Sequence, residues 1–210
     1  MTTSEDWSLQ FDLVYNNISS NQAPGLTEYE KSVFLTQAQE AVILDLYKGT
    51  TGDSFETTEE VTRYLNSLVK SDSKTLTKDP SGLYSKSKYT TSLKDDVWFV
   101  VFESVNNGTK DIQVSPTRHD ALQKDLNNPF RGPSKNKVLS TSENGKVCLY
   151  TNQDISTYKY KYLKRPYPIV LEGSEFEVNG VSDFDVEVPE SLHNSILLRA
   201  VQIAKAVWQM

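Results

Sequence analysis

The chain is poor in the residues that carry most metal and redox chemistry. It has one cysteine and two histidines among 210 residues. His119 and His193 lie far apart, and neither has a Cys or His neighbour at metal-ligand spacing. Cys148 follows Val147 in an apolar stretch and cannot form a disulfide within the chain. The sequence therefore predicts no metal site, no cofactor-binding residue, a buried thiol and no oxidising compartment.

The motifs of common enzyme classes are also missing. No G-x-x-x-x-G-K-[ST], G-x-G-x-x-G or G-x-S-x-G pattern occurs. Asp183 and Asp185 form the one local carboxylate pair that stands out, but this spacing is typical of a solvated edge, and the Ca²⁺-loop pattern is absent. We therefore expect no catalytic residue, and a protein that is not an enzyme.

Long apolar runs and excess positive charge are lacking as well. No segment approaches the ~20 apolar residues of a membrane span, and the N-terminal residues do not resemble a signal peptide. We expect no membrane association and folding in a cytoplasm. The net charge of −6 argues against a protein that coats nucleic acid, although Lys159–Arg165 is locally basic.

Helical patterns occupy the first third of the chain and its last segment. The predicted apolar stripes are Trp7, Phe11, Val14 and Ile18; Leu35, Ala38, Val42 and Leu46; Val61, Tyr64, Leu65 and Leu68; and Leu192, Ile196, Ala200, Ile203 and Val207. Thr27 with Glu30, and Thr57 with Glu60, predict capping boxes at two helix starts. Gly49 is expected to end the second helix, and Pro189 to begin the last one.

The middle of the chain has a period of two, which is typical of strands. Val97–Glu103 is apolar on both faces and is predicted to be a central strand. Asn106–Gly108 and Asn144–Gly145 predict tight turns. A short helix is expected to open at Ser115–Thr117, to run through Ala121–Leu122 and to stop at Asn127–Pro129. Ser156–Leu163 alternates Tyr with Lys, which predicts one aromatic and one basic face.

These patterns predict an α+β fold in which N-terminal helices and a C-terminal helix form a helical core around a β-rich middle insertion. The expected core comprises residues 1–70 plus 188–210. The expected insertion comprises residues 71–187 and includes Pro-rich loops and an acidic segment. The terminal helix is expected to pack against the first two helices.

Four sequence segments, taken in chain order, resemble segments of virion structural proteins of crAss-like bacteriophages. They are Tyr15–Ser32 continuing into Phe34–Glu40, Asn127–Val138, Leu163–Leu171, and Pro189–His193 with the last helix. Such proteins are similar to the ring, or adaptor, proteins of podovirus-like virions. The resemblance implies a ring of commonly twelve copies in the neck, a head-to-tail connector that links the portal to the tail, with no catalytic residue and no cofactor.

The resemblance implies partners of three kinds: copies of the chain itself in a dodecamer, the portal with adjacent neck and tail rings, and genomic DNA that passes without sequence-specific binding. It implies a place in the virion after assembly in the bacterial host cytoplasm. Candidate protein-contact residues are Asn128, Pro129, Phe130, Arg131, Pro133, Arg165, Pro166, Tyr167 and Trp208. The alternatives are another neck or tail component, such as a tail terminator or assembly factor, and a bacterial β-rich binding module that uses the Tyr-Lys strand.

Overall fold

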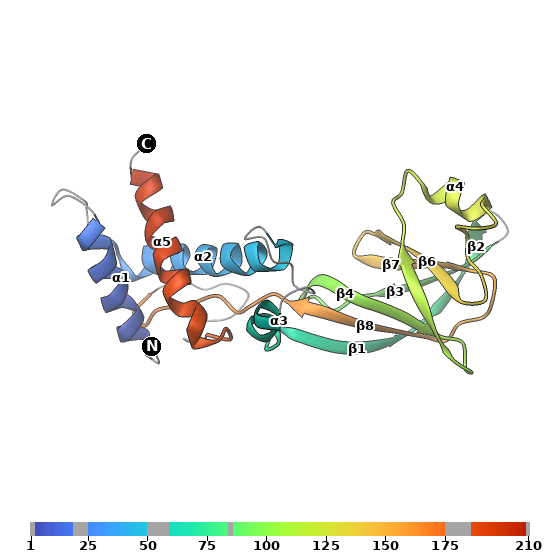
Figure 1. The fold of residues 1–210 in the computed structure, drawn as a ribbon, viewed down its shortest axis with the longest axis horizontal. Coiled ribbons are helices and arrows are strands. Elements are labelled where there is room, and N and C mark those ends of the chain that lie inside the picture. The colour runs from blue at the N-terminus through green and yellow to red at the C-terminus, as the bar shows by residue number, and fades with distance from the viewer. Residues whose placement is uncertain (1–2, 19–24, 50–58, 84–85, 175–185, 209–210) are drawn as a thin grey trace. The chain divides into compact units, whose positions relative to one another are not determined.

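The chain divides into two compact units in the computed structural model (Figure 1). The described residues are 3–18, 25–49, 59–83, 86–174 and 186–208. One unit combines residues 1–68 with 166–210 and is called the helical unit; residues 69–165 form the sheet unit. Helices and one eight-stranded sheet together confirm the predicted α+β class.

The helical unit is built from both ends of the chain. Its helices are α1 (Ser4–Ile18), α2 (Glu28–Lys48), α3 (Glu59–Leu65) and α5 (His193–Trp208), with a 3₁₀ turn at Glu190–Leu192. The terminal helix α5 packs against α1 and α2, as predicted. Thr57, the expected start of the third helix, lies outside the described residues.

Helix α2 begins and ends where its local sequence predicts. The Thr27 backbone N–H donates to the Glu30 carboxylate at 2.8 Å, and the Glu30 N–H donates to the Thr27 hydroxyl at 3.3 Å. This reciprocal pair is a capping box, which satisfies backbone donors at the first turn. Gly49 adopts φ 68°, the left-handed conformation that glycine adopts without a Cβ penalty.

The buried face of α2 differs from the predicted stripe. Leu35 and Ala38 are fully buried, but Ile43 is buried in place of Val42 and Leu46, which are half-buried. A 21-residue helix turns by 3.6 residues per turn, and neighbours along its length select which of two adjacent apolar rows is covered. Sequence periodicity alone cannot make that selection.

The last helix shows a similar shift near its end. Leu192, Ile196 and Ala200 are buried as predicted. Ile203 is half-buried and Val207 is 55 % exposed, whereas Ala204 is buried. The prediction that Ile203 and Val207 continue the buried stripe is therefore wrong, because near its end the helix turns the neighbouring row with Ala204 toward the core.

An extended segment after the sheet unit completes the helical core. The Ile169 N–H donates to the Thr36 hydroxyl at 3.1 Å, and the Leu171 N–H donates to the Ser32 hydroxyl at 3.0 Å. These hydroxyls on α2 satisfy backbone groups that are buried away from water. The sequence grouped residues 166–187 with the β-rich insertion, but the described part of this segment is bonded to α2.

The sheet unit consists of eight strands in the order β1-β8-β4-β5-β6-β7-β3-β2. Their bounds are β1 Val69–Thr75, β2 Thr77–Leu83, β3 Lys86–Ser92, β4 Val97–Asn106, β5 Asp111–Pro116, β6 Lys137–Glu143, β7 Lys146–Thr151 and β8 Thr157–Lys164. All neighbouring pairs are antiparallel except β5 and β6, which run parallel.

A single residue joins the two edges of this sheet. The edge strands β1 and β2 are consecutive in the chain, with Leu76 between them. The Leu76 N–H donates to the Ser156 carbonyl at 2.9 Å, and its side chain belongs to the buried cluster. The sheet therefore curls until its first and last strands meet end to end at this bend.

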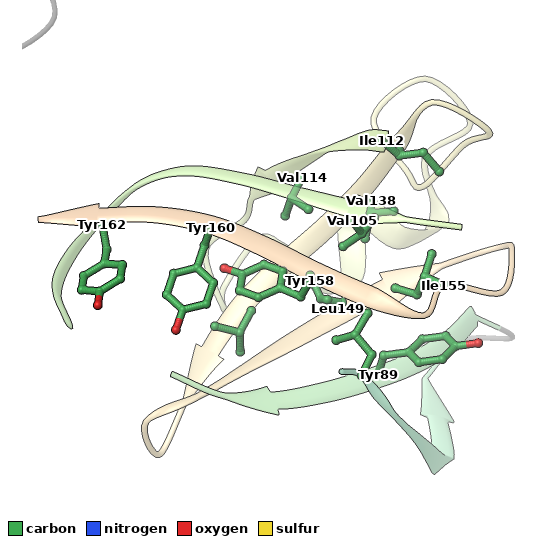
Figure 2. Packing of buried hydrophobic residues seen from close by; sticks show 12 residues of the cluster. Tyr89, Val105, Ile112, Val114, Val138, Leu149, Ile155, Tyr158, Tyr160 and Tyr162 are labelled. Carbon is green, nitrogen blue, oxygen red and sulfur yellow. The ribbon is translucent and has the colours of Figure 1, made fainter. Parts of the chain in front are cut away.

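The interior of the curled sheet holds the main apolar cluster of the unit (Figure 2). Tyr158, Tyr160 and Tyr162 line up along β8 with ring centroids 5.2 and 5.4 Å apart, and all three are buried. Lys159 and Lys161 alternate with them and are exposed. The predicted division of this strand into an aromatic and a basic face is thus confirmed.

A short helix covers part of the outer face of the sheet. Helix α4 (Leu122–Asn127) contributes Leu122 and Leu126 to a second cluster that contains Cys148, which is buried as predicted. The helix was expected to open at Ser115, but β5 continues through Pro116 because it pairs with β6. Long-range pairing therefore overrides the local Ser-Pro helix signal.

Local signals in the strands give mixed outcomes. Both predicted turns are present: β4 and β5 join through Asn106–Gly108, and Asn144 and Gly145 adopt φ 49° and 71° between β6 and β7. Strand β4 is central, flanked by β8 and β5. It is not buried on both faces, since Phe102 is 50 % exposed next to a register shift with β8.

Candidate subunit-contact surfaces

The segment 128–133, called the anchor loop below, is held by bonds to its first residue. Asn128 ends α4 in an extended conformation, as expected for a residue before proline. Its side-chain carbonyl accepts from the N–H of Phe130 at 2.8 Å and of Arg131 at 3.1 Å. The Gly132 N–H donates to the Asn128 backbone carbonyl at 2.8 Å. Asn128 thus accepts hydrogen bonds from the backbone N–H groups of Phe130, Arg131 and Gly132, while Pro129 has no N–H to donate.

Two further contacts limit the movement of the anchor loop. A Cβ at Gly132 would lie 2.6 Å from the Asn128 carbonyl oxygen, so only glycine fits this close approach. The Lys137 ammonium donates to the Arg131 carbonyl at 3.0 Å, and the Asn152 amide donates to the Pro133 carbonyl at 2.8 Å. The loop is therefore rigid by bonding as well as by its two prolines.

The tip of the anchor loop presents an apolar ring to solvent. The Phe130 side chain is 92 % exposed, the highest value among the large apolar side chains described. Pro129 and Arg131 beside it are exposed, whereas Pro133 is buried. A large aromatic side chain on a fixed backbone loses little conformational entropy on binding, as do many residues that dominate protein interfaces.

The other candidate contact residues lie in other segments of the chain. Arg165 is exposed at the end of the sheet unit, and its N–H donates to the Asp96 carbonyl at 3.0 Å. In the helical unit, Pro166 is buried and Tyr167 is 42 % exposed, with its N–H bonded to Glu187 at 3.0 Å. The side chain of Trp208 lies outside the described residues, as do Asp183 and Asp185.

Helix α1 exposes a second apolar face that the sequence interpretation missed. Trp7, Phe11 and Tyr15 are buried, but Leu9 and Leu13 are 67 % and 64 % exposed. The two leucines are four residues apart, so they lie on one side of the helix, called the α1 face below. The predicted stripe of this helix, Trp7, Phe11, Val14 and Ile18, left Leu9 and Leu13 unassigned, although they form a second pair at i, i+4 spacing. Of that stripe, Trp7 and Phe11 are buried and Val14 is half-buried.

A shallow hollow of about 500 Å³ adjoins the α1 face. It is lined by Ser4, Glu5, Ser8, Leu9, Glu28 and Glu172. The Ser4 hydroxyl accepts from the Glu172 N–H at 2.7 Å and thereby ties the extended segment to the start of α1. The hollow thus combines one exposed leucine with an acidic rim.

A buried lysine fixes α1 against α2 beside this hollow. The Lys31 ammonium lies 2.6 Å from Asp12 and 3.0 Å from Glu28, and it donates to the Ser8 hydroxyl at 3.1 Å. Burial disfavours its charge, but the hydrogen bonds and charges of Asp12 and Glu28 outweigh burial and raise the pKa of Lys31. The network therefore gives the α1 face a fixed support.

The outer side of β8 and β4 carries a different mixture of groups. A hollow of about 530 Å³ there is lined by Ser71, Asp72, Ser73, Phe102, Ser104, Asp111, Lys159, Tyr160 and Lys161. Lys159 pairs with Asp111 at 2.9 Å, and Phe102 lies opposite Lys161 in the strand register. This surface is basic and aromatic, but its charges are partly neutralised by their own neighbours.

One carboxyl group lies inside the curled sheet. Burial raises the pKa of Glu103, and the nearby hydroxyls of Ser140 and Tyr158 lower it by less. Burial also raises the pKa of the Tyr158 hydroxyl, and Glu103 adds to this rise. A carboxyl with these surroundings resembles a catalytic acid, but it lies within the packed Tyr row, where no hollow reaches it among the cavities described above.

The described residues contain no group of three or more His, Cys, Asp or Glu side chains that could hold a metal ion. Within the same part of the chain, no helix combines the length and the apolar character needed to cross a bilayer.

Comparisons with known proteins agree on one family. Residues 1–210 match the family described as phage tail ring protein 3/4. The chain is similar to Ring protein 3 of Bacteroides phage crAss001, with 35 % identity over 218 residues, which cover 96 % of this chain and 94 % of the relative. It is also similar to Ring protein 4/5 of the same phage, with 33 % identity over 222 residues, 97 % of this chain and 92 % of the relative. These matches confirm the resemblance to crAss-like phage ring proteins, and the chain belongs to the phage tail ring protein 3/4 family.

Proposed function

We propose that this chain is a virion structural protein, one subunit of an oligomeric ring in the neck of a phage, which links the portal and head to the tail. The observation that carries the proposal is the family match along the whole chain, together with two relatives named as ring proteins. The role is structural rather than catalytic. The ring forms in the bacterial host cytoplasm and remains in the virion.

The subunits of this ring are copies of the same chain, and twelve is the proposed number. The rigid anchor loop and the α1 face are suited to contacts between copies, because each presents exposed apolar side chains on a fixed backbone. Rings arise when one surface of a subunit binds a different surface of the next and the rotation closes. The portal and the adjacent neck and tail rings are the further proposed partners.

The same ring forms part of the channel through which the genome passes. The chain carries a net charge of −6, and DNA carries one phosphate charge for each nucleotide. Like charges repel, so an acidic lining lets the polymer slide without sequence-specific binding. A density map of the assembled ring tests this part of the proposal, and a lumen lined by lysine and arginine would contradict it.

The oligomer itself is tested by native mass spectrometry of the purified chain over a range of concentrations, with electron microscopy of any assembly. We expect closed rings with a mass of twelve chains. Rings of another size would correct the copy number only. A monomer that binds peptides or glycans through β8 at every concentration would contradict the proposal and favour a binding module.

A further inference from the structure

We propose that the anchor loop of one copy docks on the α1 face of the next copy, with Phe130 against Leu9 and Arg131 facing the acidic rim of the adjoining hollow. This inference rests on the proposed ring, because it requires copies of the chain to meet. It adds which two surfaces form the contact and which groups recognise each other.

The anchor loop has the properties of an inserting element. Its backbone is fixed by the two bonds to the Asn128 side chain and by the close approach at Gly132, so docking orders little that is not already ordered. Isolated exposed apolar residues are common on protein surfaces. Phe130 differs because its ring is 92 % exposed while the backbone around it is held by hydrogen bonds. These bonds involve the N–H groups of Phe130, Arg131 and Gly132 and the carbonyl of Arg131. An exposed aromatic ring on a fixed backbone is stabilised when another surface covers it.

The α1 face has the matching apolar character. Leu9 and Leu13 project side by side from a helix that Lys31 ties to α2. Leu9 also lines the hollow of about 500 Å³, so an aromatic ring placed there covers a leucine and fills a depression at the same time. Neither leucine belongs to the core of its own helical unit.

Charge complementarity favours the anchor loop as the segment that binds the α1 face. Glu5 and Glu172 are exposed at the rim of the hollow, while Glu28 is engaged by Lys31 and the Ser8 hydroxyl. Arg131 follows Phe130 directly, so a docked ring places a guanidinium near two carboxylates. Arginine is favoured for such pairing because its planar donors match a carboxylate in two positions.

Two other hollows fit the anchor loop less well. The one near the β4–β5 turn, about 700 Å³, includes Lys110 and Lys135 in its lining and contains no carboxylate there. The one on β8 includes Lys159 and Lys161, and its two carboxylates are already paired, Asp111 with Lys159 and Asp72 with Lys94. Arg131 would meet lysines in either place, and like charges that face each other at an interface oppose binding.

The proposed contact joins two different surfaces, so each copy offers one donor and one acceptor. Such a head-to-tail contact adds subunits in one direction, and it forms a ring when the rotation between neighbours closes. It therefore predicts a simple rule: a copy that lacks the donor still accepts, and a copy that lacks the acceptor still donates.

Charge reversal with rescue tests the electrostatic part. In the full chain, Arg131→Glu should weaken association by about tenfold or more, and adding Glu5→Lys with Glu172→Lys should restore much of it. Arg118→Glu is the matched control, because Arg118 is an exposed arginine of the same unit that pairs with Asp120. Sedimentation or mass photometry over a concentration series measures the association.

Mixing tests the direction of the contact. Phe130→Ala alone and Leu9→Asp alone should each remove assembly, and both side chains are exposed enough that circular dichroism and melting temperature should match the parent chain. A mixture of the two variants should form heterodimers and nothing larger, since one intact donor meets one intact acceptor. A contact made within a single chain would give no heterodimer and would overturn the inference.

The outcomes separate the inference from the proposed function. If the parent chain forms rings and Phe130→Ala and Arg131→Glu form them equally well, the docking is overturned and the ring stands. If Arg131→Glu loses assembly but the two rim lysines fail to rescue it while Leu9→Asp assembles normally, the acceptor is another surface and the inference is again overturned. If the parent chain remains a monomer throughout, both the ring and the docking fail.

Discussion

The two units of this chain form their buried cores in different ways. The helical unit takes its core from segments far apart in the sequence, and it uses the ion pair of a buried lysine and hydroxyls on α2 to join them. The sheet unit is one continuous segment whose core combines a row of buried tyrosines with aliphatic side chains inside a curled sheet. The helical unit therefore depends on both ends of the chain, whereas the sheet unit is formed by one uninterrupted segment.

The sharpest test of this difference is excision. Residues 69–165 expressed alone should fold, because Val69 pairs with Leu163 and the two ends of the segment lie on neighbouring strands. Residues 1–68 alone should remain unfolded, because they lack α5 and the extended segment at Ile169–Leu171. Circular dichroism and dispersion of amide NMR signals check both outcomes. Equal folding of the two fragments would remove the distinction.

The next largest effect is expected at the ion pairs. Lys31→Met should destabilise the protein by about 1 to 2 kcal/mol, because the Lys31 side chain is only 4 % exposed and loses its bonds to Asp12, Glu28 and Ser8, while water still reaches the two carboxylates, which are 44 % and 35 % exposed. Lys159→Met is the control in the sheet unit, where the Lys159 and Asp111 side chains are 46 % and 50 % exposed. Urea unfolding should show a clear loss for the first and little change for the second.

A smaller effect follows from Glu103 in the sheet unit. Its folded pKa is raised by burial, so the unfolded chain releases the proton first and stability falls as pH rises above its ordinary pKa of 4.5. Glu103→Gln should therefore stabilise the sheet unit at pH 7, with a gain that shrinks as pH approaches 4.5. Hydrogen exchange of β4 and β8 measures it, and a gain that is constant with pH would contradict the assignment to titration.

The smallest effect is expected at His193 in the helical unit, with the opposite sign. Burial lowers the pKa of His193, whose ring is tilted against Trp7 with centroids 5.0 Å apart and whose Nε2 bonds the Val188 carbonyl at 3.2 Å. The unfolded chain takes up the proton more readily, so the helical unit loses stability as pH falls below 6.5. His193→Gln should flatten this dependence, as measured by hydrogen exchange of α1 and α5 between pH 5 and 8.

Local chemistry explains what the sequence could predict. The capping box at Thr27, the turn at Asn144–Gly145 and the alternating face of β8 each depend on residues within a few positions of one another. The anchor loop belongs to this group in part. Its proline and glycine spacing predicts a rigid loop, and the bonds to Asn128 are the usual way that asparagine organises such a turn.

Long-range choices explain what the sequence could not predict. The parallel pairing of β5 with β6, and the burial of Ile43 rather than Val42, depend on which distant segment packs against each element and not on nearby residues. A lysine on a helix is normally expected to be exposed, yet Lys31 is buried, and it forms an ion pair with Asp12 of another helix. The α1 face was missed for the same reason, since a second apolar series has no local sign of whether it is covered.

The bend at Leu76 also bears on the two edges of the sheet. Open sheet edges can recruit strands from other chains and so begin fibre growth. Here the edge strands are tied together end to end and carry Lys70, Lys74 and Pro80, a residue that lacks an amide hydrogen. The fold thereby discourages growth into fibres and leaves side chains, rather than strand edges, to govern self-association.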